Sequence, residues 1–293
     1  MTTVYHFSGA GNDFVVIDGR EGDVSQYREV PRIEALCKEH KTDGLMILGQ
    51  EMPGQAGHDG RSEDVMADPD RPSVDFTMEF FNPDGSGGMM CGNGGRCIVA
   101  FADYLGIKPA SGDVFLFRAP DGLHTGEILA RPEDGLWTVR IKMIDVQGIT
   151  PMLGGYFLNT GTRHFVKFVD DVEQVDIDTE GRALRWNEAF APVGTNVNFV
   201  HVAPDGLHVR TFEKGVEGET LACGTGLTAS AIAAYAAGVI PDADVRLRAR
   251  QDWLSVNFTP GADEKFTDVY LTGPARLVEI LYLELLPILL LAS

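Results

Sequence analysis

The sequence contains two similar segments, residues 90–106 and 222–238, in which a cysteine precedes a glycine-rich stretch and an apolar run. The first begins MCGNGGR and the second ACGTGL, and Cys91 and Cys223 are 132 positions apart (223 − 91). A glycine turn that opens a helix leaves backbone N–H groups unpaired at the positive end of the helix dipole. Such a place favours thiolate over thiol and suits an anionic ligand. The pair therefore predicts two thiols that face one substrate from opposite sides.

The repeat extends beyond the cysteines. Phe80 and Phe212 are also 132 apart, whereas GNDFVVID at 11–18 matches TRHFVKFV at 162–169 with an offset of 151 (165 − 14). The difference between the two offsets, 151 − 132, requires about 19 extra residues in the first half, between Phe14 and Phe80. The Gly-, Pro- and Asp-rich stretch 50–73 is expected to be this insertion, as a surface loop. The predicted domains are residues 1–148 with Cys91 and residues 149–280 with Cys223, followed by an apolar terminal extension, residues 281–293.

Each half is expected to combine strands with one long buried helix, so the predicted fold class is α+β with two pseudo-symmetric homologous domains. Alternating apolar residues and Asp-Gly turns indicate antiparallel strands, and apolar residues at helical spacing indicate an early amphipathic helix. The expected elements are a hairpin over Tyr5–Asp18, a helix over Arg32–Lys41, a strand over Gly44–Leu48, strands over Val114–Phe117 and Leu136–Ile141, a hairpin of Asn196–Val202 with Leu207–Phe212, and strands over Val256–Phe258 and Val269–Leu271.

Composition excludes several classes of function. The 293 residues are 44% hydrophobic and 23% charged with a formal net charge of −19, which argues against a nucleic-acid-binding surface. The sequence begins without the basic and apolar parts of a signal peptide, and its four cysteines are few for a disulfide framework, so a reducing cytoplasm is expected. No segment has the roughly 18 to 20 apolar residues that span a bilayer, so no membrane partner is expected.

Two thiols on either side of one carbon suit proton abstraction on one face and donation on the other, which inverts that carbon. No lysine stands out as a Schiff-base candidate, and Gly9-Ala10-Gly11 lacks the third glycine of a dinucleotide-binding fingerprint. The spacing of cysteine and histidine does not match a zinc site. We therefore expect an enzyme without cofactor or metal, in which two helix N-termini stabilise the carbanion electrostatically.

These motifs resemble the diaminopimelate epimerase family, which interconverts LL- and meso-diaminopimelate in lysine and peptidoglycan biosynthesis without a cofactor. The matching segments, in family order, are GNDF at 11–14, FNPDG at 81–85, MCGNGGRC at 90–97, GTNV at 194–197, EKGV at 213–216 and ETLACGTG at 219–226. The resemblance implies two β-barrel-like sheets, each wrapped around a central helix, and a homodimer that acts on a small amino-acid substrate.

The resemblance also implies roles for individual residues. Cys91 and Cys223 correspond to the acid/base thiols, and His164 and Glu213 to groups that tune their pKa. The residues implied to bind substrate are Asn12, Asn82, Gly92, Asn93, Thr162, Asn196, Glu213, Lys214, Gly224 and Thr225. Three positions depart from the family pattern: Gly44 replaces a glutamine, Gly161-Thr162-Arg163-His164 replaces Gly-Asn-Pro-His, and Lys214 replaces an arginine, whose bidentate fork a lysine cannot reproduce.

Other interpretations of the cysteines remain open. Cys37 and Cys97 are expected to be packing residues, because a buried cysteine usually behaves as a small apolar side chain. The chain could be a racemase of another amino acid with the same fold, a thiol redox protein with a switchable Cys91–Cys223 disulfide, or a non-catalytic binding module. Solvent isotope exchange at a substrate α-carbon by the reduced protein separates an epimerase from a redox switch.

Overall fold

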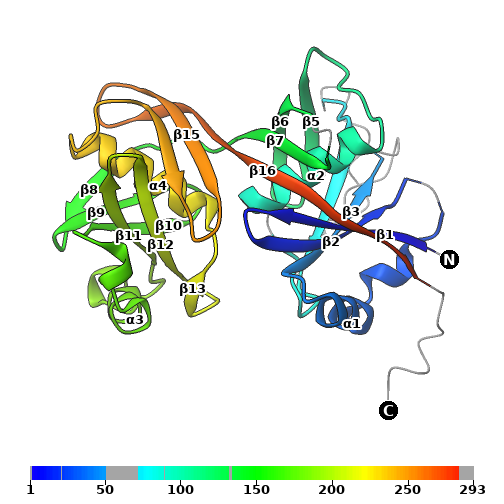
Figure 1. The fold of residues 1–293 in the computed structure, drawn as a ribbon, viewed down its shortest axis with the longest axis horizontal. Coiled ribbons are helices and arrows are strands. Elements are labelled where there is room, and N and C mark those ends of the chain that lie inside the picture. Colours follow the sequence, from blue (N-terminus) through cyan, green and yellow to red (C-terminus); the bar gives the residue numbers. More distant parts are fainter. Residues whose placement is uncertain (1, 21, 51–71, 89, 132–133, 284–293) are drawn as a thin grey trace. The chain divides into compact units, whose positions relative to one another are not determined.

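The computed structural model describes residues 2–20, 22–50, 72–88, 90–131 and 134–283, which fall into two compact units (Figure 1). The first unit contains residues 1–139 and 275–293, and the second contains residues 140–274. Residues 140–148 thus belong with the second unit, and residues 275–280 belong with the first, unlike in the predicted division. Most of the predicted insertion, residues 51–71, lies outside the described residues.

The first unit contains strands on both sides of a helix that starts after Cys91. Its elements are β1 (Thr2–Gly9), β2 (Asn12–Asp18), the 3₁₀ turn η1 (Ser25–Arg28), α1 (Val30–His40), β3 (Gly44–Gly49), β4 (Phe76–Phe81), α2 (Gly92–Tyr104), β5 (Val114–Ala119), β6 (Gly122–Ala130) and the start of β7 (Leu136–Lys142). The predicted first hairpin, early helix and following strand are confirmed as β1–β2, α1 and β3.

The second unit repeats this plan around the helix that starts after Cys223. Its elements are β8 (Ile149–Met152), β9 (Gly155–Asn159), β10 (Arg163–Phe168), the short turns η2 (Val172–Gln174), η3 (Ile177–Gly181) and η4 (Glu188–Phe190), α3 (Arg182–Arg185), β11 (Asn196–Ala203), β12 (Gly206–Glu213), β13 (Gly218–Thr220), α4 (Gly224–Ala236), β14 (Asp244–Arg248), β15 (Trp253–Pro260) and the first part of β16 (Phe266–Leu283). The predicted hairpin and late strands are confirmed as β11–β12, β15 and β16.

Strand pairing shows that the two units are homologous halves. In the first unit the pairs β1–β2, β3–β4 and β5–β6 are antiparallel, and the pairs β2–β3 and β4–β5 between them are parallel. The series β9, β10, β11, β12, β14 and β15 has the same order of directions. The predicted α+β fold with two pseudo-symmetric domains is therefore confirmed.

Strand β16 belongs to both units. It pairs with β15 through residues 266–272 and with β1 through residues 276–283 (Figure 1). Leu281 and Leu283 pack against the core cluster that contains α1. Residues 281–283 of the predicted terminal extension are thus part of a strand, and the remainder of that extension lies outside the described residues.

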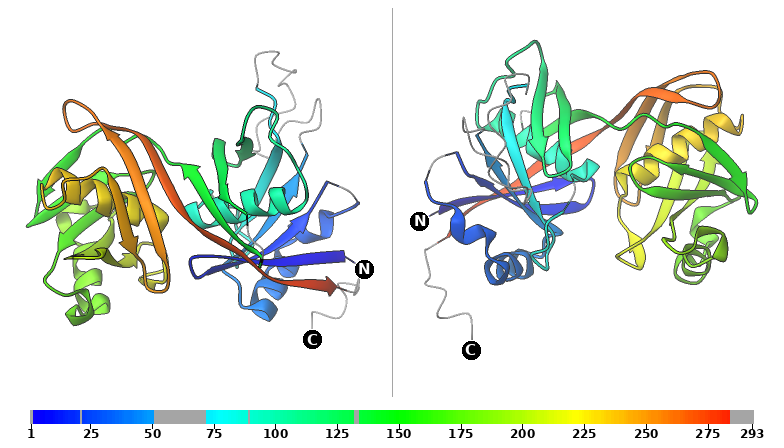
Figure 2. Two further views of the ribbon diagram at one scale, coloured as in Figure 1. Left: turned by 45° about the horizontal axis from the view of Figure 1, so that its top comes forward. Right: turned by 180° about the vertical axis from the view of Figure 1, so that it is seen from behind.

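Each unit has its central helix packed against its own strands (Figure 2). In α2 the residues from Cys97 to Ala102 are fully buried, and Phe101 contacts Tyr5 and Phe7 of β1. The helix α4 is lined by small residues such as Ala229 and Ala233 that let the surrounding strands approach closely. Just past the C-terminal ends of α2 and α4, Gly106 and Gly238 adopt φ of +77° and +68°, a conformation that glycine tolerates at a helix end. Within the described part of the chain, none of the helices is both long enough and apolar enough to cross a membrane.

Candidate active site

Cys91 occupies the N-cap of α2, between an extended backbone and the first helical turn. Its carbonyl accepts the first helical bond from the N–H of Gly95, and its Sγ accepts from the N–H of Gly94 at 3.2 Å. A Cβ at position 94 would lie 3.2 Å from the same sulfur, so glycine lets the thiol approach the helix N-terminus closely. The predicted position of Cys91 at the start of a glycine-rich helix is confirmed.

The polar side chains beside Cys91 form a chain of hydrogen bonds. The amide of Asn93 donates to Asn12 Oδ1, and Asn12 donates to Asp43 Oδ2 at 3.2 Å. Asn93 Oδ1 accepts from the fully buried Arg96, whose guanidinium also donates to the carbonyl of Gly92. The hairpin β1–β2 and the first turn of α2 are thereby held together. Two of the predicted substrate-binding residues, Asn12 and Asn93, are in direct contact.

Asn82 lies in a different setting. It begins a tight turn after β4, in which its Nδ2 donates to Ser86 Oγ at 3.0 Å and its carbonyl accepts from the N–H of Gly85. The side-chain bond of Asn82 that the structure describes thus stays within its own turn. Its predicted contact with substrate stays a prediction.

Cys223 is the N-cap of α4, the equivalent position in the second unit. Its carbonyl accepts from the N–H of Leu227 at 2.9 Å, and its Sγ is 3.4 Å from Thr225 Oγ1. The residue is 8% exposed. Gly224 and Gly226 flank Thr225, and a Cβ at position 226 would lie 2.4 Å from Asn198 Oδ1. A larger residue at position 226 would therefore require the Asn198 side chain to shift.

His164 is fully buried behind Thr225. Its Nε2 is 3.0 Å from Thr225 Oγ1 and 2.9 Å from Thr162 Oγ1, while Asn198 Nδ2 donates to its Nδ1. Burial lowers the pKa of His164 to about 3, so the ring is neutral at physiological pH. Because Nδ1 accepts from Asn198, the ring proton sits on Nε2 and points to the threonine hydroxyls.

A second group of predicted residues surrounds Asn196 at the start of β11. Asn196 Nδ2 donates to the carbonyl of Arg163 at 3.0 Å and lies 3.4 Å from Thr162 Oγ1, and its Oδ1 accepts from the N–H of Lys214 at 2.7 Å. Glu213 ends β12 with its side chain partly buried, and Lys214 is exposed in the turn that follows. His164, Thr162, Thr225, Asn196 and the Glu213–Lys214 turn thus lie around the Cys223 end of α4.

Sequence reasoning missed several residues that hold these groups in place. Asn198 fixes the His164 tautomer, and its own orientation is fixed because Thr211 donates to its Oδ1 and its Nδ2 also donates to the carbonyl of Phe165. The asparagine pair at i and i+2 of a strand, in Asn196-Val197-Asn198, was a signal that could have identified it, because both side chains face the same side. The fully buried Arg96 had no such signal.

The structure separates the buried cysteines from the candidate thiols. Cys37 lies on α1 within the core cluster of the first unit, and burial raises its pKa. Cys97 is fully buried one and a half turns into α2, and burial raises its pKa also. Both surroundings suit packing residues. The convergence of Cys91 and Cys223 on one carbon stays a prediction, because each lies in its own unit.

Comparison with known proteins finds the same family that the sequence motifs resemble. A family model for diaminopimelate epimerase matches residues 156–278. The diaminopimelate epimerase of Chlorobaculum tepidum is 38% identical over 281 residues, which cover 92% of this chain and 97% of that protein. That of Aquifex aeolicus is 37% identical over 284 residues, covering 92% of this chain and 93% of that protein.

Solved structures share the fold at low sequence identity. A PhzF-family phenazine biosynthesis protein from Bacillus anthracis has a TM-score of 0.70 at 12% identity, covering 97% of this chain and 99% of that chain. A probable proline racemase from Agrobacterium radiobacter has a TM-score of 0.64 at 15% identity, covering 98% of this chain and 94% of that chain. These similarities concern the fold alone.

Proposed function

The chain belongs to the diaminopimelate epimerase family, and from that premise we propose that it interconverts LL- and meso-2,6-diaminopimelate by moving a proton at one α-carbon between Cys91 and Cys223. The observation that carries the proposal is the duplication of a thiol at the N-terminus of a buried helix, once in each homologous unit. One cysteine as thiolate removes the α-hydrogen, and the other as thiol supplies a proton to the opposite face.

Charge develops on the substrate in this reaction, and the helix N-termini are suited to stabilise it. The first turns of α2 and α4 present the N–H groups of Gly92-Asn93 and Gly224-Thr225 next to the thiols. We propose that these groups hold the reacting α-carboxylate, because oriented N–H donors stabilise negative charge without having to reorganise. The polar ends of the substrate are assigned to Asn12, Asn82, Thr162, Asn196, Glu213 and Lys214.

We further propose that His164 acts on Cys223 through the Thr225 hydroxyl. When Thr225 Oγ1 accepts from the Nε2–H of His164, its own hydrogen is free to donate to the sulfur 3.4 Å away. A hydroxyl donor stabilises thiolate relative to thiol. A neutral histidine would thus tune the thiol by orienting a hydroxyl rather than by adding a positive charge. Glu213 is assigned a pKa-tuning role at the same end of the site.

The test is proton exchange in deuterium oxide. The reduced protein is incubated with LL-diaminopimelate, and the appearance of meso isomer and of deuterium at one α-carbon is followed by mass spectrometry and chiral chromatography. We expect deuterium in the product isomer at each turnover. Exchange with another amino acid but not with diaminopimelate would identify a racemase of different specificity. No exchange with any of them would favour the redox alternative.

We also propose that the protein works as a homodimer in a reducing cytoplasm. The four cysteines are all thiols in the structure, which suits chemistry that needs a thiolate and a thiol together. Sedimentation equilibrium of the reduced protein measures its oligomeric state, and fractionation of cells that express it measures its location. A monomer at micromolar concentration, or recovery outside the cytoplasmic fraction, would contradict them.

A further inference from the structure

The strand pair that follows each cysteine helix forms a hairpin whose tip returns to the segment just before that cysteine. In the first unit this hairpin is β5–β6, with residues 120–121 at its tip, and in the second it is β14–β15, with residues 249–252 at its tip. The two hairpins occupy the same place in the repeated pairing order. Met90, directly before Cys91, and residues 221–222, directly before Cys223, lie outside helices and strands, so their positions depend on contacts of this kind.

In the first unit the contact is made by Asp121. Its Oδ1 accepts from the backbone N–H of Met90, the residue directly before Cys91, at 3.1 Å. The same oxygen is 3.1 Å from His124 Nε2. Burial opposes ionisation of the Asp121 carboxyl, but these two partners hold its pKa below the usual range, so it is a carboxylate at neutral pH. A charged acceptor makes the bond to Met90 stronger than a neutral one would.

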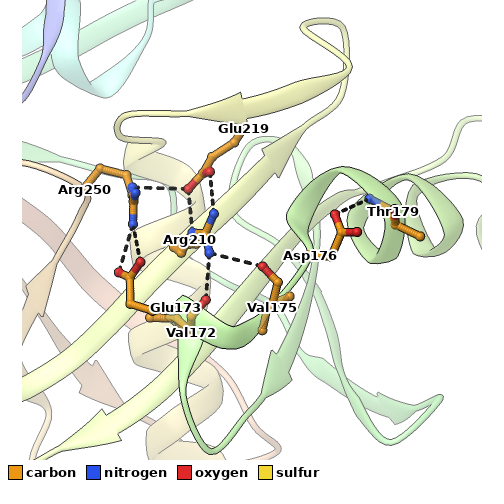
Figure 3. A network of polar contacts seen from close by, with 8 residues as sticks. All are labelled: Val172, Glu173, Val175, Asp176, Thr179, Arg210, Glu219 and Arg250. Carbon is orange, nitrogen blue, oxygen red and sulfur yellow. Dashed lines mark hydrogen bonds and ion pairs between the residues drawn. The ribbon is translucent and has the colours of Figure 1, made fainter.

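In the second unit the contact is made by Arg250. Its backbone N–H donates to the carbonyl of Leu221 at 3.1 Å, two residues before Cys223. Its guanidinium lies between two carboxylates (Figure 3): Nε is 3.4 Å from Glu219 Oε1, and one terminal nitrogen donates to both oxygens of Glu173 at 2.9 and 3.0 Å. Arg250 therefore ties the strand that leads to Cys223 to the turn η2.

Glu219 has a second arginine on its other side (Figure 3). Arg210 of β12 donates to both Glu219 oxygens at 2.7 Å, and its remaining terminal nitrogen donates to the carbonyls of Val172 and Val175. Bidentate arginine–carboxylate pairs fix orientation as well as distance. The segment from Glu219 to Leu221 is thus held from both sides, and only Ala222 lies between it and Cys223.

We propose that the two hairpin tips are positioning devices for the two thiols, Asp121 for Cys91 and Arg250 for Cys223. Neither residue takes part in the proton transfer. The inference rests on the proposed function for its catalytic consequence, because an error of about 1 Å in the position of a reacting group can lower a rate by about 100-fold. The inference also has a purely structural consequence: loss of the contact at one hairpin tip should alter the position of one cysteine and leave the other unchanged.

The chain offers matched controls for both residues. Asp205 also precedes a glycine at a hairpin tip and pairs with a histidine three residues on, at 2.9 Å, but it lies at the tip of β11–β12 and this bond stays within its own hairpin. Arg20 makes a two-bond pair with Asp18 in the first unit, comparable to the arginine pairs above. Asp205→Ala and Arg20→Gln remove the same chemistry at other places.

The experiment measures iodoacetamide labelling of Cys91 and Cys223 separately, by peptide mass spectrometry of the full chain. At pH 10, where ordinary thiols are ionised, the rate reports access to each sulfur. We expect Asp121→Ala to label several-fold faster at Cys91 only and Arg250→Gln at Cys223 only, with both controls matching wild type. Asp121→Asn keeps an acceptor oxygen and should restore the wild-type rate. Both Asp121→Ala and Arg250→Gln should lower kcat about tenfold or more, with KM within about twofold.

Labelling of either variant that matches its control would overturn the proposal, as would an equal increase at both cysteines. Because labelling needs no substrate, the positioning role of the hairpin tips and the proposed epimerase function can be rejected independently. If the cysteine-specific labelling appears but the wild-type protein exchanges no α-hydrogen, the positioning role is supported and the proposed function is wrong.

Discussion

At the scale of single residues, the two N-cap cysteines differ in their partners. The Cys91 sulfur accepts a backbone N–H from its own helix, whereas the Cys223 sulfur lies beside the hydroxyl of Thr225. The same repeated position therefore carries a thiol stabilised by backbone in one unit and by a side chain in the other. The two thiols are expected to respond differently to substitutions around them.

The first prediction concerns the thiols themselves. Cys91→Ala and Cys223→Ala should each lower the epimerisation rate by about 10² to 10⁴-fold, because a general acid or base contributes about that factor. Folding should be nearly unchanged, since each side chain lies at a helix start and not within the packed part of its helix. Chiral chromatography measures the rate, and circular dichroism measures the fold. If either variant keeps more than about a hundredth of the wild-type rate, that thiol is not essential.

The second prediction concerns Thr225. Thr225→Val removes the hydroxyl next to the Cys223 sulfur and should raise the pKa of that thiol by about one to two units, since a hydrogen bond to a charged group contributes about 1.5–3 kcal/mol. Thr225→Ser keeps the hydroxyl and should keep the wild-type value. The pH dependence of alkylation at Cys223, with Cys91 as the internal reference, measures the shift. An unchanged pH dependence of Cys223 alkylation in Thr225→Val would show that the Thr225 hydroxyl does not tune this thiol.

The third prediction concerns the buried His164. An unfolded histidine has a pKa near 6.5, whereas burial lowers that of His164 to about 3. Between these values the unfolded chain binds one more proton than the folded chain, so the free energy of unfolding falls as pH falls, by at most about 1.4 kcal/mol per unit. This contribution is fully present above about pH 6.5. Urea unfolding from pH 4 to 8 should show a shallower slope for His164→Gln than for wild type; equal slopes would contradict it.

At the scale of elements, the start of α4 depends on close packing against β11. Position 226 faces the amide of Asn198, and an added Cβ would lie 2.4 Å from its Oδ1, whereas at position 94 of α2 the closest atom is the Cys91 sulfur at 3.2 Å. The two equivalent glycines thus differ in what surrounds them. The amide that limits position 226 is also the one that orients His164.

The fourth prediction follows from this difference. Gly226→Ala should destabilise the protein by about 1–3 kcal/mol, because extra volume in a packed site forces its neighbours to move. Gly94→Ala should cost less, since alanine favours a helix over glycine by about 1 kcal/mol and only a sulfur must shift. Urea unfolding of both variants gives the comparison. If Gly94→Ala is the more destabilised of the two, the packing argument at Asn198 is wrong.

At the scale of the whole molecule, the chain forms its first unit from both of its ends. Strand β1 pairs with β2 on one side and with residues 276–283 of β16 on the other. The core of the first unit therefore depends on a strand that comes after the whole of the second unit. The apolar residues Leu281 and Leu283 of that strand contribute to the cluster around α1.

The fifth prediction tests this dependence. A chain that ends at Pro274 lacks the partner of β1 and should lose hydrogen-exchange protection in the first unit while the second unit keeps it, because unpaired strand edges open locally. A chain that ends at Leu283 retains the pairing and should exchange like the full chain. Peptide-resolved hydrogen exchange measures both units in one experiment. Equal loss of protection in both units would show that they unfold together.

The sequence alone was enough to predict the two-unit plan, the helix starts at both cysteines and the strands around them. These features depend on local signals: glycine turns, apolar periodicity and the offsets of 132 and 151 residues between the copies. Local signals repeat when a domain is duplicated, so two weak patterns support each other. The family motifs added the roles of the polar residues, which composition and spacing could not supply.

Only the tertiary structure decided which side chains complete each site. The bond from Asp121 to Met90, the orientation of His164 by Asn198 and the bonds of Arg250 to Glu219 and Leu221 join residues 29 to 34 positions apart. The pairing of β16 with β1 joins residues 268 to 281 positions apart. Such contacts depend on how strands pair in register, and a single sequence without its fold carries no local pattern that specifies them.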